Sequence, residues 1–176
     1  MNNAPGIPPS AETLAQREAI RDILFTHSRG LDRLDPTLLK QAYWPDADVD
    51  YGAFKGSAHQ FAEIIGPALS SQFELTQHLL GQTLIELDSD RASTETYVYA
   101  RHLLLGAEQE LAFAGRYLDQ LQCRDGQWKI AHRRVVMDWC HRVAVDDERT
   151  GEAFGSLCKG AQGKPDPSYD LFGTTQ

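Results

Sequence analysis

The second half of this chain consists of four long stretches with the composition and alternation of β-strands, and they constrain the fold more than any other feature. The stretch 92–105 is rich in Thr, Tyr and Val, and turn signals such as Asp88-Ser89-Asp90 and Arg124-Asp125-Gly126 separate the stretches. Turns this short join antiparallel neighbours. The predicted strands are residues 75–87, 92–105, 111–122 and 128–145. We therefore expect a meander of long antiparallel strands.

The first half of the chain shows helical periodicity instead. A first helix is predicted from about Ala11, with Ser10 as its N-cap, because apolar residues recur at helical spacing as far as Leu34. Gly30 weakens this helix near its end. Helices that precede a run of strands indicate an α+β fold, since a parallel sheet would need strands and helices in alternation.

Two shorter helices are predicted next. Asp35-Pro36 supplies an N-cap and a first-turn proline for a second helix, which is expected to end at Trp44-Pro45. A short strand or hairpin over residues 48–56 follows, and Ser57 then begins a capping box and a third helix, which Pro67 is expected to break or kink. A strongly bent sheet with helices on its concave side forms a cone, and we expect this cone-shaped α+β barrel to hold a small apolar ligand.

The length of 176 residues suits one domain with its own core. Prolines predict a loose arm over residues 1–9, and residues 10–145 are expected to form the domain. Residues 146–176 are expected to form a tail, with one short helix around 152–157, that closes the cone or contacts a neighbouring subunit. The residues available for a hydrophobic lid are Tyr169, Leu171 and Phe172.

The net charge is −8, from 17 basic and 25 acidic residues, which argues against nucleic acid or an anionic membrane as a partner. No apolar run is long enough to span a membrane and no signal peptide is recognisable, so a cytoplasmic location is expected. The three widely spaced cysteines are typical of reduced thiols. Without a Gly-rich phosphate loop or histidines at ligand spacing, no metal, nucleotide or flavin is expected.

Several short motifs occur in the order and spacing of a known family. They are the helix end RGLDRLD, the stretch Trp44-Pro45-Asp46-Ala47, Tyr51-Gly52 followed by Lys55-Gly56, His78 at the head of a strand, and GRYLDQLQCRDGQWKIAHR. Over residues 10–142 the chain resembles the NTF2-like superfamily and, within it, the SnoaL-like group that includes scytalone dehydratase and related lyases. The resemblance implies a cone-shaped fold with a small-molecule site inside it.

The resemblance also implies an acid–base pair, because Asp32 matches the aspartate of the family lyases and His78 their histidine. A histidine held by a carboxylate is a general base near neutral pH, since the carboxylate fixes the tautomer and stabilises the imidazolium. Helical periodicity alone would favour Asp35 as the inward acid, at about 80° from His27 against about 140° for Asp32. We nevertheless choose Asp32, because Asp35 is better explained as the cap before Pro36 and Gly30 allows the helix to deviate.

Other candidates have two interpretations each. His27 is either a core histidine bonded to a carbonyl or a proton donor to the leaving group. The segment of His132, Arg133 and Arg134 is ambiguous, since a bulge would change which of them points inward. The remaining candidates contact the substrate or serve as wall, rim or solvated-face residues. They are Trp44, Tyr51, Tyr97, Arg101, His102, Phe113 and Arg116.

Together these features predict a cofactor-independent lyase that removes water from a small hydrophobic aromatic or alicyclic alcohol. Loss of formaldehyde from a hydroxymethyl-bearing aryl compound fits the same acid–base chemistry. One alternative is an isomerase or cyclase of the ketosteroid-isomerase or SnoaL kind. Another is a module that only binds a small ligand or another protein. The resemblance also implies a homo-oligomer, a dimer or a trimer, that packs through the outer face of the sheet.

Overall fold

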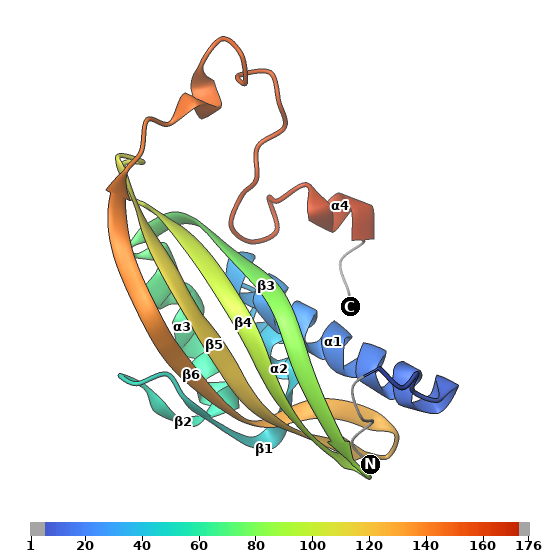
Figure 1. The fold of residues 1–176 in the computed structure, drawn as a ribbon. Coiled ribbons are helices and arrows are strands. Elements are labelled where there is room, and N and C mark those ends of the chain that lie inside the picture. The colour runs from blue at the N-terminus through green and yellow to red at the C-terminus, as the bar shows by residue number, and fades with distance from the viewer. Residues whose placement is uncertain (1–5, 173–176) are drawn as a thin grey trace.

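Three helices cover one strongly curved sheet and precede its four long strands, in the predicted order (Figure 1). The computed structural model describes residues 6–172. The helices are α1 (Ala11–Asp32), α2 (Pro36–Ala42), α3 (Ala58–Ser70) and, in the tail, α4 (Ser168–Phe172), with a 3-10 turn η1 (Glu148–Thr150) before α4. The strands are β1 (Tyr43–Asp50), β2 (Lys55–Ser57), β3 (Phe73–Asp88), β4 (Arg91–Leu104), β5 (Gln109–Arg124) and β6 (Gln127–Ala144).

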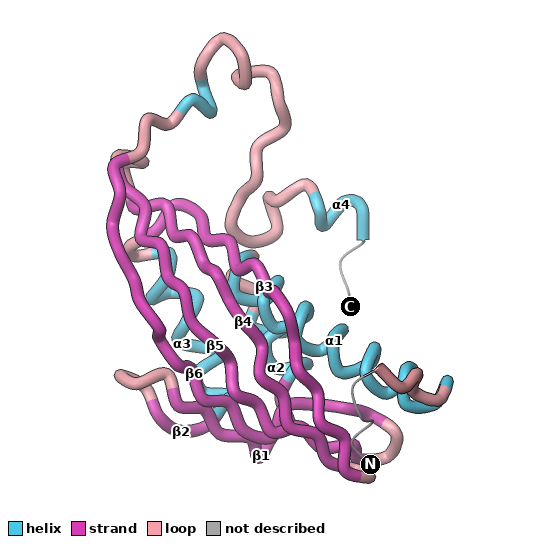
Figure 2. Tube along the Cα trace, viewed as in Figure 1, coloured by secondary structure: helices cyan, strands magenta, loops and turns pink. Residues whose placement is uncertain are grey.

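The six strands form one mixed sheet in the order β2-β1-β6-β5-β4-β3. All pairings are antiparallel except that of β1 with β6, which is parallel. The four long strands curve together, and α1 and α3 lie on the same side of them (Figure 2). The cone-shaped α+β architecture is therefore confirmed. The sheet does not close into a complete barrel, because β2 and β3 remain at its two edges.

Helix α1 begins where the sequence predicts, because the Ser10 hydroxyl accepts a hydrogen bond from the backbone N–H of Thr13 at 3.1 Å. The helix continues through Gly30. A Cβ atom at this position would lie 2.9 Å from Cγ of Leu39 in α2. Glycine is therefore required here for the close approach of α2 to the end of α1, even though it costs some helix propensity.

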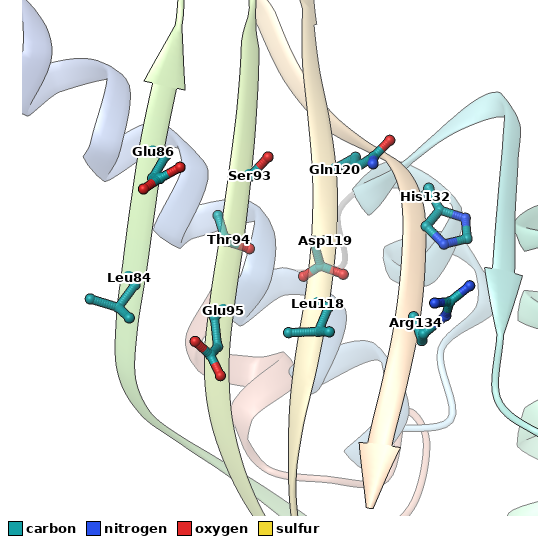
Figure 3. A pocket seen from close by; sticks show the side chains of 10 residues that line it. All are labelled: Leu84, Glu86, Ser93, Thr94, Glu95, Leu118, Asp119, Gln120, His132 and Arg134. Atoms are coloured by element: carbon teal, nitrogen blue, oxygen red, sulfur yellow. The ribbon is translucent and has the colours of Figure 1, made fainter. Parts of the chain in front are cut away.

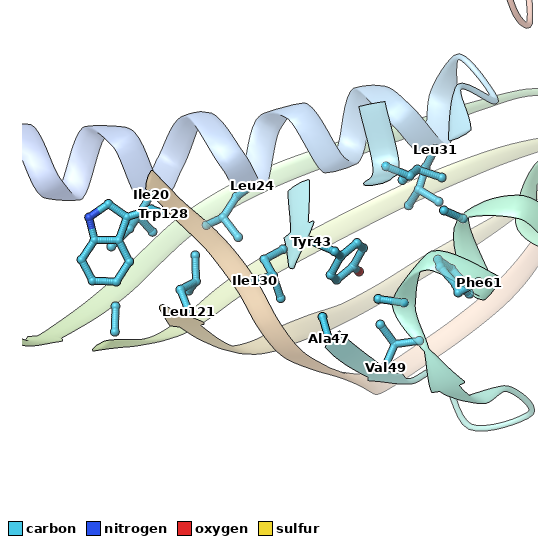
Figure 4. Packing of buried hydrophobic residues seen from close by; sticks show 14 of the residues in the cluster. Ile20, Leu24, Leu31, Tyr43, Ala47, Val49, Phe61, Leu121, Trp128 and Ile130 are labelled. Carbon is cyan, nitrogen blue, oxygen red and sulfur yellow. The ribbon is translucent and has the colours of Figure 1, made fainter. Parts of the chain in front are cut away.

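One part of the core lies between α1 and the hairpin of β5 and β6, and the same cluster continues to β1 and α3 (Figure 4). Ile20 and Leu24 of α1 pack in one cluster with Leu121, Trp128 and Ile130. Ile20 and Ile130 have no exposed surface at all. Burying an aliphatic side chain of this size stabilises a fold by about 1.5–3 kcal/mol. This cluster fixes the position of α1 on the sheet, and with it the position of the residues at the end of α1.

Three local features differ from the predicted ones. Strand β1 begins at Tyr43 and contains Trp44-Pro45, because it pairs with β6, whose Ile130 lies opposite Tyr43. Helix α3 runs through Pro67 to Ser70, since a proline in the last turn removes only one of its hydrogen bonds. Residues 152–157 form turns and not a helix. All of them are exposed, so a helix there would have no face to bury.

The tail leaves the end of β6, arches away from the body and returns to the C-terminal end of α1 (Figure 1). Arg33 donates to Asp166 at 2.8 Å, and the Tyr169 hydroxyl donates to Asp35 at 2.7 Å. Leu171 and Phe172 remain 77% and 72% exposed. The tail therefore fastens to the helix end and does not cover the fold with these two residues as a hydrophobic lid. Within residues 6–172, no helix is long and apolar enough to cross a membrane.

Candidate active site

The end of α1 and the start of β3 bring Asp32 and His78 into direct contact. Nδ1 of His78 lies 2.7 Å from Oδ1 of Asp32, and the two side chains are only 7% and 11% exposed. The backbone N–H of His78 donates to Oδ2 of Asp32 at 3.0 Å, and the hydroxyl of Thr76 donates to Oδ1 at the same distance. Three donors thus hold the carboxylate, and alternation along β3 turns both Thr76 and His78 toward it.

The direction of these hydrogen bonds fixes the tautomer of His78. An ionised carboxylate only accepts hydrogen bonds, so Nδ1 of His78 carries the proton that is shared with Asp32. The lone pair is then on Nε2, and His78 is one of the residues that line an apolar cavity. The pair can therefore accept a proton from a molecule in this cavity.

Asp32 points inward although helical periodicity favours Asp35. The reason is that the curved sheet wraps around α1, which contacts β3 as well as β6. His27 faces β6, where it contacts Arg133, while Asp32 faces β3. Asp35 caps α2, as predicted, by accepting from the N–H groups of its first turn at 2.9 and 3.1 Å.

The cavity beside His78 has a volume of about 170 Å³ and mostly apolar walls. Helices α1 and α3 line it on one side and strands β3 to β6 on the other. Besides His78, three of the lining residues have a nitrogen or oxygen atom in the side chain. Its lining residues are Leu31, Tyr51, Phe61, Ile65, Leu69, His78, Ala100, His102, Phe113, Tyr117 and Val135. The predicted substrate contacts of Tyr51, His102 and Phe113 are therefore compatible with their positions.

His102 lies next to His78, with the two rings perpendicular and their centroids 5.3 Å apart. Its Nδ1 lies 3.3 Å from the carbonyl oxygen of Leu111, which can only accept, so Nδ1 carries the proton. Burial and the neighbouring His78 lower the pKa of His102 to about 4. His102 is therefore neutral at physiological pH and has its lone pair on Nε2.

His27 lies behind the cavity wall and has no exposed surface. Arg133 donates to its Nδ1 at 2.7 Å, and its Nε2 lies 3.3 Å from the hydroxyl oxygen of Tyr51. Burial and the adjacent Arg133 cation hold the pKa of His27 well below its usual value. The arrangement favours the interpretation of His27 as a bonded core histidine over that of a direct proton donor.

Arg133 is the buried cation of the site, and sequence reasoning left its direction open. It makes two hydrogen bonds of 2.7 Å to the carboxylate of Asp119, and neither side chain is exposed. Its guanidinium also lies 4.1 Å from the ring centre of Tyr117. The pairing of β5 with β6 shifts between Gln120 and Leu121, so a bulge decides that Arg133 points inward.

Four residues that were predicted to contact the substrate have side chains outside this cavity. Tyr97 is 42% exposed on the outer face of the sheet. Arg101 pairs there with Glu110, at 2.9 Å from Nε, and Arg116 pairs with Glu95 and Asp138, at 2.8 and 2.9 Å. Trp44 packs elsewhere, with its ring under the guanidinium of Arg124 at 4.7 Å. The opposite strand parity of Arg101 and Arg116 already indicated the outer face.

A larger hollow of about 470 Å³ lies on the outer face of the sheet (Figure 3). Two of its basic side chains already have acidic partners: His132 lies 2.9 Å from Asp48, and Arg134 lies 3.6 Å from Asp50. His78, His102 and Asp32 do not line it. We therefore place the candidate site in the smaller inner cavity. Among the described residues, no cluster of three His, Cys, Asp or Glu side chains could hold a metal ion.

The family model of the SnoaL-like domain matches residues 12–134. The chain belongs to the SnoaL-like family. Uncharacterised proteins of Mycobacterium tuberculosis and Mycobacterium bovis are 26% identical to it over 129 residues, which cover 70% of this chain and 86% of each relative. The tail lies outside the matched residues.

Two solved structures illustrate the shared fold. The hexachlorocyclohexane dehydrochlorinase LinA type 2 has a TM-score of 0.70 and 22% identity, over 77% of this chain and 93% of that one. A candidate scytalone dehydratase from Novosphingobium aromaticivorans has a TM-score of 0.67 and 21% identity, over 86% of this chain and 95% of that one. At these identities the likeness shows the fold alone.

Proposed function

We propose that this protein is a cofactor-independent lyase that eliminates water, or a small fragment such as formaldehyde, from a small hydrophobic aromatic or alicyclic alcohol. The observation that supports this function is the Asp32–His78 pair, whose free nitrogen belongs to a residue that lines an apolar cavity. Membership of the SnoaL-like family and the resemblance in fold to a dehydrochlorinase and a candidate dehydratase support a lyase or isomerase class.

In this proposal His78 is the general base. Its Nε2 takes a proton from carbon, and the imidazolium that forms is stabilised by the carboxylate of Asp32 at 2.7 Å. Asp32 is already held by two further donors, so little reorganisation is needed when the charge develops. The apolar walls exclude water, which strengthens this electrostatic stabilisation.

The position of His102 next to His78 favours an isomerase or cyclase as the second candidate function. Its ring centre lies 5.3 Å from that of His78, so two imidazole rings lie close together in the cavity wall. A proton taken from one carbon by His78 could return to another carbon beside His102. A lyase releases two products, whereas an isomerase returns one product of unchanged mass.

The discriminating experiment is a mass-spectrometric screen of the purified protein against small aryl and alicyclic alcohols, including hydroxymethyl-bearing aryl compounds. A lyase gives a product lighter by the mass of water or formaldehyde, and His78→Ala removes this activity. An unchanged mass with a new retention time would assign an isomerase. No conversion by the wild type, with binding retained, would make the protein a ligand-binding module and overturn the proposed function.

We also propose that the protein is a homo-oligomer that buries the outer face of its sheet. Apolar side chains are exposed there on three strands: Leu79 is 51% exposed, Tyr99 40% and Trp139 62%. Apolar groups that are continuous across a sheet favour association with another copy. The test is the molar mass from light scattering of the wild type and of Trp139→Glu. A wild-type monomer would rule out this assembly.

A further inference from the structure

The Asp32–His78 pair borders a second hollow besides the inner cavity. This hollow of about 300 Å³ lies between α1 and β3, and both Asp32 and His78 line it. Arg29 and Arg33, at the end of α1, line it as well. The carboxylate that is proposed to support the base therefore has two cations beside it in addition to the imidazole.

Either arginine is placed to compete with His78 for this carboxylate. Arg29 precedes Asp32 by three residues, a spacing at which opposite charges on a helix attract each other. Arg33 follows Asp32 directly, and both side chains border the same hollow. A guanidinium binds a carboxylate through two parallel hydrogen bonds and would neutralise the charge that stabilises the His78 imidazolium. An active pair thus requires that both arginines be held elsewhere.

The tail binds Arg33. Nη1 of Arg33 donates to Oδ2 of Asp166 and to the carbonyl oxygen of Ala161, both at 2.8 Å. The backbone N–H of Gly163 donates to the carbonyl oxygen of Arg33 at 2.9 Å. Within residues 6–172, the acidic partner of Arg33 is Asp166 and not Asp32. The tail therefore fixes both the backbone and the side chain of the residue next to Asp32.

Asp166 is held as an anion by several further hydrogen bonds. Oδ2 also accepts from the backbone N–H of Ala161, and Oδ1 accepts from the backbone N–H of Ser168, both at 3.0 Å. The Ser168 hydroxyl donates to Oδ1 as well. Burial opposes ionisation, but the donors of Ser168 and Ala161 and the charge of Arg33 outweigh it and lower the pKa of Asp166 to about 2. At physiological pH this carboxylate is therefore charged and available to Arg33.

The next residues of the tail bind Arg29. Nη1 of Arg29 donates to the hydroxyl oxygen of Ser168 at 3.1 Å. The guanidinium carbon of Arg29 lies 5.2 Å from the ring centre of Tyr169 and 5.3 Å from that of Phe172. Aromatic rings attract a guanidinium at these distances. Both arginines beside Asp32 are thus bound to the tail.

We propose that Asp166 is a positioning residue of the active site, because it holds the guanidinium of Arg33 away from Asp32 and leaves that carboxylate to His78. This inference rests on the proposed function, in which Asp32 and His78 are the base. Asp166 does not line the inner cavity and acts through Arg33. The inference assigns a role in the reaction to a segment that lies outside residues 12–134, which the family model matches.

The first test measures the tautomer of His78 and needs no substrate. Nitrogen chemical shifts of the imidazole are recorded by NMR on the full chain, at a pH at which the ring is neutral. We expect the wild type to hold the proton on Nδ1, as the contact with Asp32 requires. In Asp166→Asn the freed Arg33 pairs with Asp32, so we expect a mixture of both tautomers. Combining Asp166→Asn with Arg33→Gln removes the competing cation and should restore the wild-type tautomer.

Kinetics on the substrate found in the screen provide the second test. Asp166→Asn should lower kcat about fivefold with KM unchanged, since a competing ion pair of this kind is weak. The added Arg33→Gln should restore kcat, although both variants lose the ion pair of Arg33 with Asp166 and should melt at a lower temperature than the wild type. Asp170→Asn removes the same charge from an exposed position of the tail and is expected to match the wild type.

The outcomes separate this inference from the proposed function. A tail that only supported the fold would make the double variant less active than Asp166→Asn, in parallel with its stability. That result, or an unchanged tautomer in Asp166→Asn, would overturn the inference and leave the proposed base intact. A mixture of tautomers in the wild type would overturn the proposed base, and this inference with it.

Discussion

The molecule contains two aspartate–histidine pairs of nearly the same geometry in very different surroundings. Asp32 and His78 are 2.7 Å apart inside the fold, with side chains 11% and 7% exposed. Asp48 and His132 are 2.9 Å apart on the outer face of the sheet, with side chains 62% and 28% exposed. Water screens the second pair, so this ion pair contributes only about 0–1 kcal/mol to stability. Proximity alone therefore does not make a catalytic pair.

The inner pair differs in its supports as well as in its burial. Asp32 receives hydrogen bonds from Thr76 and from the backbone of His78 in addition to the imidazole. Hydrogen bonds of this kind fix both the carboxylate and the ring that it orients, which preorganises the base. The comparison of the two pairs supplies matched controls, because the same substitution can be made in each.

The largest expected difference is in the histidines. His78→Ala removes the proposed base and should lower kcat about 1,000-fold, because positioned general bases contribute about 10²–10⁴-fold. His132→Ala, the control, should leave kcat unchanged. Both variants should bind product with wild-type affinity, measured by calorimetry. Comparable losses of activity in the two variants would remove the distinction between the pairs.

The aspartates should show a smaller difference in the same direction. Asp32→Asn keeps the size of the side chain but presents an amide that can hold His78 in the wrong tautomer, so kcat should fall about 100-fold. Asp48→Asn should have no effect on kcat. Steady-state kinetics on the substrate from the screen measures both. Full activity of Asp32→Asn would mean that the base works without its carboxylate.

The free energy of unfolding should depend on pH because of His102, the buried neighbour of the inner pair. Its pKa in the folded protein is about 4, so between pH 4 and about 6.5 the unfolded chain binds an additional proton. Stability should therefore fall as the pH is lowered through this window, by on the order of 2–3 kcal/mol, and this contribution should be constant below pH 4.

His102→Phe removes this titration and should flatten the dependence of the unfolding free energy on pH by up to about 1.4 kcal/mol per pH unit within the window. Urea denaturation at several pH values measures the slope in the variant and in the wild type. Parallel curves for the two proteins would show that His102 is not buried in the neutral form.

The tail should have the smallest effect, and only on the inner pair. Its contacts with Arg33 and Asp35 flank Asp32, whereas the described part of the tail makes no hydrogen bond beside Asp48. A chain that ends at Asp146 should lose about 1–2 kcal/mol of stability and severalfold in kcat, because the end of α1 is held less firmly. Leu171→Ser, at a position 77% exposed, is the control and should change neither. Unchanged kinetics and melting temperature after truncation would leave the tail without a role at the site.

The four long strands and the start of α1 could be predicted from the sequence, because alternation, turn residues and the Ser10 cap act locally. The start of β1 at Tyr43 could not, since it depends on parallel pairing with β6, far away in the chain. The contact of Asp32 with His78 followed from the family resemblance and ran against the helical period. Because the curved sheet surrounds α1, residues on a larger part of the helix circumference face inward than the spacing of its apolar residues predicts.

Two buried residues near the site, Arg133 and Tyr117, were not identified from the sequence, for different reasons. The direction of Arg133 depends on a bulge in β6, and bulges have no reliable sequence signal. Tyr117 has the inward parity in β5, but the sequence does not show that the guanidinium of Arg133 lies against its ring. Tyr97, Arg101 and Arg116 were placed in the cavity for their chemistry, although strand parity pointed outward.

The pairing of Asp119 with Arg133 has a consequence for how this protein assembles. The two residues lie directly opposite each other in neighbouring strands of one hairpin, whose turn joins β5 to β6. Their charges can neutralise each other while the hairpin is still surrounded by water, before α1 arrives to cover them. If α1 docks after this hairpin has formed, it covers a salt bridge and not two separate ions, so neither charge loses its water without a partner.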